Sequence, residues 1–433
     1  MGVWEAWGLR RPRGPALIIA LVVAGLVICG YIATVRDLLA LPHLRMIDLS
    51  VYRGGAEAVI HGQALYSGSF YRELKFTYPP FAALFFTPLT LSGVAVNTVL
   101  ILLINLALLA AAVRRMSLLA ERPLGKLPVM MLSALLLGCE PVRTTWTLGQ
   151  VDLLVAALII TDLSLGETSP WQGLLIGLAA GIKLTPLIFL VYLAFAGHWR
   201  SALRGGAAFL TTVALSFLLL SHESSVFWLH GTVLHASRTG DVASWFNQSL
   251  LGALDRITRG NETGVALPID LLILGCGLWS ARSFERRGDR VSALTLTGVT
   301  GLLISPISWF HQWTVVILAL PFLILSGRVI ALRLMALTLL FTALLFPLIS
   351  GLFGHSLPQQ ILTDLYVEAG LVAVFAATLW SLHNRTGLKG DPGGRSTGLT
   401  PGADHPGRDR VTTALINQDE ATGGAIPGVG IDH

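Results

Sequence analysis

Long apolar segments alternate with short polar connections along most of this chain. About twelve segments are apolar enough to be considered as membrane helices. They are Ala16–Val35, Val94–Val113, Leu127–Gly138, Val151–Leu165, Gly173–Ile182, Leu184–Ala196, Ala207–Leu220, Leu267–Ser280, Val291–Ile304, Trp313–Leu325, Val329–Ile349 and Leu365–Trp380. Segments shorter than about 17 residues must tilt, extend into their flanks or be shielded by protein. The pattern therefore predicts an all-α, polytopic membrane protein.

Composition supports the membrane interpretation. The 433 residues are 53% hydrophobic and 13% charged, and a soluble fold of this composition would expose large apolar patches to water. Basic residues precede Ala16–Val35 as in a signal peptide, but its length and the lack of a cleavage site favour a retained first helix. Beyond Trp380 the sequence is polar and rich in Gly and Pro. We therefore expect a membrane domain at residues 1–382 and a disordered cytoplasmic tail at residues 383–433.

The positions of Lys and Arg orient the predicted helices, because cytoplasmic loops carry the excess of positive charge. Basic clusters fall on one side of the helices, at residues 10–13, 114–126, 200–204, 282–290 and 328–333. The opposite side receives the loops at residues 36–80, 139–150, 222–266, 305–312 and 350–364. The first of these outer loops is also basic, which binding of a phosphate group would explain. The chain is thus predicted to be a multi-pass plasma-membrane protein with its functional loops on the extracytoplasmic face.

The outer loops carry the candidate chemistry. Ser50–Ile60 and Phe81–Leu89 are expected to be short helices at the membrane surface, the second after Pro79 and Pro80. Ionisable groups at membrane depth are costly and so mark functional sites, and Asp48 is the clearest of them. Its plainer interpretation is an N-cap of the following helix. The aromatic, basic and proline-rich residues downstream favour a binding groove instead.

Other polar positions in these loops also have structural interpretations. Glu140 and Arg143 are three residues apart and are suited to pair with each other. Lys183 is compatible with snorkelling to the interface, although its position between two short apolar segments suggests the tip of a hairpin. His311 fits either a satisfied interfacial histidine or a group that contacts a ligand. The tryptophans of these loops are alternatively interfacial anchors.

The sequence lacks the motifs of several enzyme classes. Cys29, Cys139 and Cys276 have no partner at zinc-ligand or redox spacing, so we expect them to be packing residues. The sequence has no Asp-x-Asp pair, no His-x-x-x-His, no phosphate loop and no dinucleotide fingerprint. A soluble enzyme that uses a nucleotide sugar or ATP is therefore disfavoured. We expect no metal, no cofactor and no nucleic-acid partner.

Several of these positions follow one another in a characteristic order. The runs are Ile47-Asp48-Leu49-Ser50-Val51-Tyr52, Phe76-Thr77-Tyr78-Pro79-Pro80, Gly149-Gln150-Val151-Asp152, Lys183-Leu184-Thr185-Pro186 and Ser305 to His311. Together they resemble the actinobacterial polyprenol-phosphate-mannose-dependent mannosyltransferases of the membrane GT-C class. The resemblance extends over roughly Arg13 to Trp380. It is strongest to members that add an α-1,2-linked mannose to phosphatidylinositol mannosides, taking the four-mannose lipid to the five-mannose lipid.

The resemblance implies an inverting transfer from β-linked polyprenyl phosphomannose to a phosphatidylinositol mannoside, among membrane lipids. It places the catalytic aspartate of the family at Asp48, as general base. The leaving phosphate needs cations, for which Lys183 is the first candidate and Arg53 and Lys75 the next. His311 is expected to share this task or to orient the acceptor. The expected sugar- and acceptor-binding residues are Tyr52, Tyr78, Gln150, Trp245, Asn247, Gln248 and Trp309.

Two other functions are compatible with the sequence. A transporter of a lipid-linked sugar would also be polytopic and bind phosphate, but its ionisable residues belong near the bilayer midplane rather than at one face. A sister transferase that uses arabinofuranose or glucose, or one that branches lipomannan or lipoarabinomannan, would share the fold and differ in the pocket. The sequence leaves the acceptor and the linkage open between these enzymes.

Overall fold

The computed structural model describes residues 46–235, 238–258, 265–349 and 363–384, with isolated positions between 25 and 35. Within these residues the chain is helical, and its β pairings are two isolated bridges, Tyr71–Leu74 and Asn247–Trp309. Most of the predicted helix Ala16–Val35 and the predicted tail from residue 385 onward lie outside the described residues.

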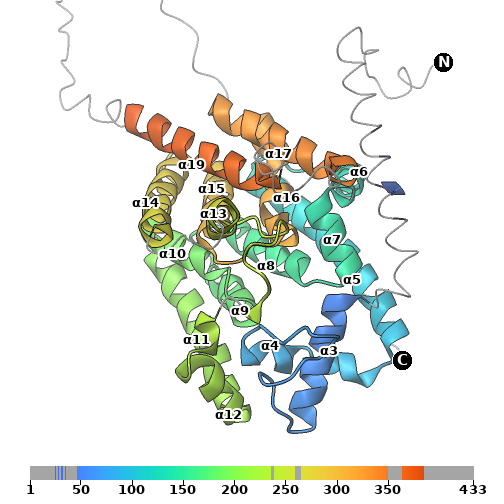
Figure 1. Ribbon diagram of the computed structural model, residues 1–433. Coiled ribbons are helices and arrows are strands. Elements are labelled where there is room, and N and C mark those ends of the chain that lie inside the picture. The colour runs from blue at the N-terminus through green and yellow to red at the C-terminus, as the bar shows by residue number, and fades with distance from the viewer. Residues whose placement is uncertain are drawn as a thin grey trace, which may run out of the picture. The chain divides into compact units, whose positions relative to one another are not determined.

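The helices follow one another along the chain with short connections (Figure 1). They are α3 (Ile47–Ile60), α4 (Pro80–Phe85), η1 (Thr87–Leu91), α5 (Val94–Leu119), α6 (Lys126–Leu137), α7 (Glu140–Leu148), α8 (Asp152–Ser164), α9 (Leu174–Ile182), α10 (Leu187–Ala196), α11 (Trp199–Leu219), α12 (Ser221–Ser224), η2 (Ser225–Leu229), η3 (Thr232–Leu234), α13 (Leu250–Thr258), α14 (Ala266–Glu285), α15 (Arg290–Ile304), η5 (Phe310–Trp313), α16 (Thr314–Ser326), α17 (Ile330–Ile349) and α19 (Leu365–His383).

Every predicted apolar segment after the first coincides with a helix. The predicted and observed bounds differ most at α5, α11 and α14. These three helices extend beyond the apolar run into flanking sequence that contains arginines. A helix has no reason to end where the hydrocarbon ends, because its backbone hydrogen bonds are internal and Arg is a good helix former. The two expected surface helices are also present. The first begins at Ile47 rather than Ser50, and the second is divided at Phe86 into α4 and η1.

The prediction of about twelve transmembrane helices is not confirmed. Within the described ranges, 4 helices are long and apolar enough to cross a membrane alone, namely α5, α11, α14 and α19. The pair α6 and α7, bent by 83°, adds a fifth candidate if the two form one broken span. The remaining apolar helices, such as α10 and α15, are shorter. Short apolar helices need protein around them to shield their ends.

The short helices α15 and α16 form the centre of the core. Nearly all of their residues are buried, among them Leu296, Val316 and Ile317. In Figure 1, α15 packs beside α14 and α16, and α17 packs beside α19. Because α15 and α16 are buried along nearly their whole length, their apolar side chains pack against protein.

A glycine seam fixes the position of α9 against α11. A Cβ atom on Gly177 would lie 2.2 Å from the Gly205 carbonyl oxygen, so only glycine permits this approach. The seam holds the C-terminal end of α9, where Lys183 is the C-cap residue. The packing of α9 against α11 therefore determines the backbone position of Lys183.

The helix bundle carries different polar groups at its two ends. At one end, the start of α8, the end of α9 and the loop before α16 converge. At the other end, Arg290 donates to the Leu163 carbonyl, and Arg204 donates to the Ser169 carbonyl at 2.7 Å. The basic clusters at residues 200–204 and 282–290 belong to this second end. The predicted inner and outer loops are thus separated along the helices.

Candidate functional site

A cavity of about 980 Å³ lies at the end of the bundle opposite the basic clusters. Its wall contains α3, the end of α9 and residues from the loops at 73–79, 232–246 and 305–312. The predicted site residues that line it are Asp48, Lys75, Tyr78, Gln150, Lys183, Trp309 and His311. Residues from five separate parts of the sequence thus face one cavity, as the resemblance implies.

Asp48 lies in the first turn of α3 and faces the cavity. The N-cap of α3 is Met46, which has φ 45° and no side-chain capping bond, so the N-cap interpretation of Asp48 is wrong. Burial raises the pKa of Asp48, whereas the positive charges of His311 and Lys183 lower it in part. Asp48 is consequently a more basic carboxylate than one exposed to water.

Asp152, at the start of α8, joins two of the predicted functional residues. Its Oδ1 accepts a hydrogen bond from Lys183 Nζ at 2.6 Å, and its Oδ2 lies 2.7 Å from His311 Nδ1. All three residues are less than 10% exposed: Asp152 6%, Lys183 7% and His311 7%. A carboxylate at Nδ1 orients the imidazole and leaves Nε2 for other partners. The four residues Asp48, Asp152, Lys183 and His311 are called the acid–base cluster below.

Asp152 had no predicted role, although the residues around it carry a signal. The polar run Gly149-Gln150-Val151-Asp152 stands directly before an apolar helix, where a carboxylate is costly unless it is paired. Its two partners are 31 and 159 residues away along the chain. Only the fold identifies them.

Two tyrosines and a glutamine form a hydrogen-bonded group beside Asp48. The Tyr52 hydroxyl donates to Gln150 Oε1 at 2.5 Å and lies 2.9 Å from the Tyr78 hydroxyl, to which Gln150 Nε2 donates at 3.1 Å. Tyr78 and Gln150 line the cavity. Tyr52 is buried behind them and stacks on Phe86 at 4.3 Å. The group connects α3 and the segment before α4 to the turn before α8.

Asn247 and Gln248 lie behind the cavity wall rather than on it. Asn247 Nδ2 donates to the Pro306 carbonyl at 3.2 Å, and its Oδ1 accepts from the Ser308 amide at 2.8 Å. Gln248 Nε2 donates to the Thr363 carbonyl at 2.8 Å. Both side chains are fully buried. The Asn247 amide thus holds the loop that carries Trp309 and His311, and the Gln248 amide bonds to the segment before α19. Neither side chain lines the cavity.

Arg53 and Trp245 are also absent from the cavity lining. Arg53 pairs with Glu57 on the outer surface of α3 at 3.1 Å. Trp245 stacks on Phe246 at 3.7 Å, and Phe246 lines the cavity in its place. A further lining cation that the sequence interpretation missed is Arg238. The only feature of the sequence that pointed to Arg238 was its position as a basic residue in a predicted outer loop.

The comparison with protein families identifies the chain. The model of glycosyltransferase family 87 matches residues 76–306, which is more than half of the sequence. The chain belongs to glycosyltransferase family 87. The matched region of this family 87 glycosyltransferase includes Tyr78, Gln150, Asp152 and Lys183. The predicted enzyme class, a membrane glycosyltransferase, is confirmed.

Curated relatives of this family 87 glycosyltransferase carry more specific names. A polyprenol-phosphate-mannose-dependent alpha-(1-2)-phosphatidylinositol mannoside mannosyltransferase of Mycobacterium tuberculosis is 32% identical over 337 residues, 72% of this chain and 78% of that protein. A polyprenol-phosphate-mannose-dependent alpha-(1-2)-phosphatidylinositol pentamannoside mannosyltransferase of the same species is 33% identical over 70% of both chains. A protein of that second name from Mycolicibacterium smegmatis is 33% identical over 66% of this chain and 71% of that protein. The search of solved structures found no significant match.

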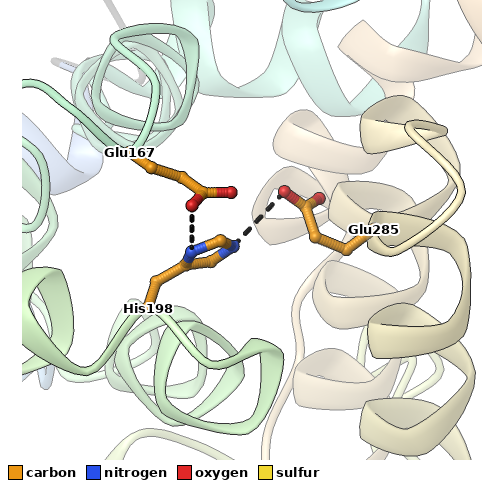
Figure 2. A group of neighbouring side chains, drawn as sticks. All are labelled: Glu167, His198 and Glu285. Atoms are coloured by element: carbon orange, nitrogen blue, oxygen red, sulfur yellow. Dashed lines mark ion pairs between the residues drawn. The ribbon is translucent and has the colours of Figure 1, made fainter.

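One group of metal-ligating side chains occurs among the described residues of this family 87 glycosyltransferase, at the basic end of the bundle. It consists of Glu167, His198 and Glu285 (Figure 2), whose ligand atoms lie within 4.8 Å of one another. Arg290 Nε lies 3.5 Å from Glu285, and the Tyr192 hydroxyl donates to Glu285 at 2.6 Å. Arg290 would repel a metal ion, and these donors already occupy the Glu285 carboxylate. The group fits an ion-pair network that ties the α10–α11 turn to α14.

His198 makes the stability of this end depend on pH. The hydrogen bond with Glu285 raises the pKa of His198 above 6.5. The stabilisation of the folded state by protonated His198 is therefore complete below pH 6.5. It is lost as the pH rises through the higher pKa of His198 in the folded state. Between about pH 6 and pH 9, the melting temperature of the wild type should fall by about 2 °C more than that of His198→Gln. Thermal unfolding in detergent measures this, and equal falls in the two proteins would contradict the role of His198.

Proposed function

We propose that this chain transfers mannose from polyprenyl phosphomannose to a phosphatidylinositol mannoside, forming an α-1,2 linkage at the extracytoplasmic face of the plasma membrane. The observation that carries the proposal is the acid–base cluster, of which Asp48, Lys183 and His311 line a cavity of about 980 Å³ in a family 87 glycosyltransferase. The names of the relatives supply the donor and acceptor.

Asp48 is the general base in this proposal. An acceptor hydroxyl attacks the anomeric carbon of mannose as the bond from that carbon to the polyprenyl phosphate oxygen breaks. Asp48 takes the hydroxyl proton, and attack from the face opposite the phosphate converts a β-linked donor into an α-linked product. The burial that raises the pKa of Asp48 favours proton acceptance. The nearby positive charges of His311 and Lys183 favour the ionised carboxylate and so oppose the effect of burial.

The leaving polyprenyl phosphate is stabilised by Lys183 and His311. Both line the cavity, and Asp152 holds both in place before substrate arrives. Charged groups that are already oriented stabilise developing charge without a reorganisation cost. In its neutral form, His311 is also the second candidate for the base, because its Nδ1 partner leaves Nε2 available. Tyr78, Gln150 and Trp309 supply hydrogen bonds and an aromatic surface for the sugars.

The distribution of basic residues supports the assigned membrane face. The arginine clusters of α11 and of the α14–α15 connection lie at the end of the bundle opposite the cavity. Positive residues mark the cytoplasmic side, so the cavity opens on the extracytoplasmic side. A lipid-linked donor suits that compartment because it needs no soluble nucleotide sugar.

The proposed activity is tested with purified protein, polyprenyl phosphomannose and a phosphatidylinositol mannoside acceptor. We expect one added mannose that an α-1,2-specific mannosidase removes, and the same yield in the presence of EDTA. GDP-mannose without the lipid donor is the negative control. Transfer from polyprenyl phosphoarabinose but not from the mannose donor would replace the proposal with a sister transferase. Movement of the lipid-linked sugar across liposomes without transfer to any acceptor would replace it with a transporter.

A further inference from the structure

The cavity has a second basic component outside the acid–base cluster. Arg238 and Lys75 both line the cavity. The charged side chains that act on Asp48 are His311, Lys183 and Asp152, all members of the cluster. Arg238 is therefore a separate centre of positive charge on the same cavity.

Arg238 is held on a buried aromatic support. Its Nη2 donates to the Tyr66 carbonyl at 2.7 Å, and its guanidinium carbon lies 5.9 Å from the centre of the Tyr66 ring. Tyr66 is 4% exposed and packs against Phe227 at 5.3 Å. The carboxylate of Glu223, whose charge acts on Tyr66, accepts a hydrogen bond from the Leu65 amide at 3.1 Å. Among the ion pairs of the described residues, none involves Arg238.

A guanidinium in this setting is suited to a phosphate. Arg has five N–H donors in a fixed fork that matches the oxygens of a phosphate group, and the Tyr66 carbonyl uses one of them. The aromatic ring and the carbonyl fix the orientation of the fork, so less side-chain entropy is lost on binding. Arg238 is thus prepared to bind an anion that enters the cavity.

The proposed reaction brings two lipid phosphates into one cavity. The donor phosphate is bonded to the reacting anomeric carbon, so it must lie beside the base, where Lys183 and His311 are. The phosphodiester of a phosphatidylinositol mannoside is separated from the reacting hydroxyl by several sugar rings. It must therefore lie away from the acid–base cluster. Arg238 lines the same cavity and is not among the charges that act on Asp48, so it suits this second phosphate.

We propose that Arg238, supported by Tyr66, binds the phosphodiester of the phosphatidylinositol acceptor. Lys75 adds positive potential to the same cavity. This inference rests on the proposed function and assigns the acceptor headgroup to a residue that the catalytic proposal does not use. Such a site would bind an anionic glycolipid acceptor more tightly than a neutral mannoside.

The kinetic test uses Arg238→Gln, Arg238→Lys and a matched control. Arg72→Gln is the control, because Arg72 also belongs to an outer loop and stacks on a tyrosine, at 5.5 Å, but does not line the cavity. Arg238→Gln should raise the acceptor KM by at least about tenfold, as expected for losing a hydrogen-bonded charge. The donor KM should stay unchanged, and Arg238→Lys should recover part of the effect. With an alkyl mannoside acceptor that lacks phosphate, wild type and Arg238→Gln should have the same KM.

Three results would overturn the assignment. A raised donor KM with an unchanged acceptor KM would place the donor phosphate at Arg238. An equal loss with the phosphate-free mannoside would mean that Arg238 only supports the fold around Tyr66. The same change in Arg72→Gln would mean that general surface charge attracts the lipid.

A binding measurement separates this inference from the proposed function. Phosphatidylinositol without mannose, presented in nanodiscs to the full-length protein, should bind wild type at least about tenfold more tightly than Arg238→Gln. This result in a protein that transfers no mannose would refute the proposed function and retain the anion site. Equal binding by both proteins would refute the anion site, whatever the transfer activity.

Discussion

Asp48→Asn should lower kcat for mannose transfer by about 10²- to 10⁴-fold, the range associated with losing a general base. Asparagine keeps the volume and the polar contact with Gln150 but cannot accept the acceptor proton. The fold should survive, because Asp48 is not the cap of α3. Steady-state rates at equal folded yield measure the loss, and protection from thermal unfolding by the donor shows that donor binding persists.

The pH profile gives a second readout for Asp48. Activity should increase as the pH rises through the pKa of Asp48, because only the carboxylate accepts a proton. Burial raises the pKa of Asp48 above 3.8, so the rising limb of the pH–activity profile should lie at higher pH than it would for an exposed aspartate. Asp48→Asn should remove the limb. The control is Glu57→Gln in the same helix, where the side chain is 44% exposed and pairs with Arg53. Full activity in Asp48→Asn would instead assign the base to His311.

Asp152→Ala should both unfold the site and inactivate the enzyme. It removes the partner of two side chains that are buried, Lys183 and His311. Leaving a buried charge without its partner costs about 3–5 kcal/mol. The melting temperature in detergent and the kcat of the remaining folded protein measure the two effects separately.

A double variant distinguishes lost stability from lost chemistry at Asp152. Asp152→Ala with Lys183→Met removes both charges of the pair and should recover much of the stability, because no lysine is left unpaired. Its activity should stay low, since the leaving phosphate has lost a cation. Asp364→Ala is the matched control, because Asp364 is the buried partner of Arg256 and does not line the cavity. It should lower stability while the folded fraction keeps its kcat. Wild-type activity in the double variant would remove Lys183 from the mechanism.

The helices could be predicted from the sequence, but which of them cross the membrane could not. Apolar runs identified every described long helix, because an apolar segment of this length is typical of a helix both in lipid and in a protein core. Hydropathy does not separate these two surroundings. Leu296 in α15 and Ile317 in α16 are apolar because they lie inside the protein. The expected span count was therefore higher than the described helices support.

The site was predicted in part, and the errors have local causes. Asp48, Lys183 and His311 were recognisable because each is an ionisable or polar group beside an apolar segment. Arg53, a candidate for the phosphate, does not line the cavity and pairs with Glu57 one turn later in α3. In an outer loop, the sequence does not distinguish an amide that faces the cavity from one that bonds to backbone. Asn247 is of the second kind.

The backbone partners of Asn247 and Gln248 have a consequence for biogenesis. Asn247 bonds to residues 59 and 61 positions later in the chain, and Gln248 bonds to a carbonyl 115 positions later. A ribosome delivers these partners only after α13, α14 and α15 have left the exit tunnel. The loop that bears His311 is thus fastened only after α15 has been made. A nascent chain stalled before Thr363 would already contain every residue that lines the cavity, but Gln248 would lack its partner.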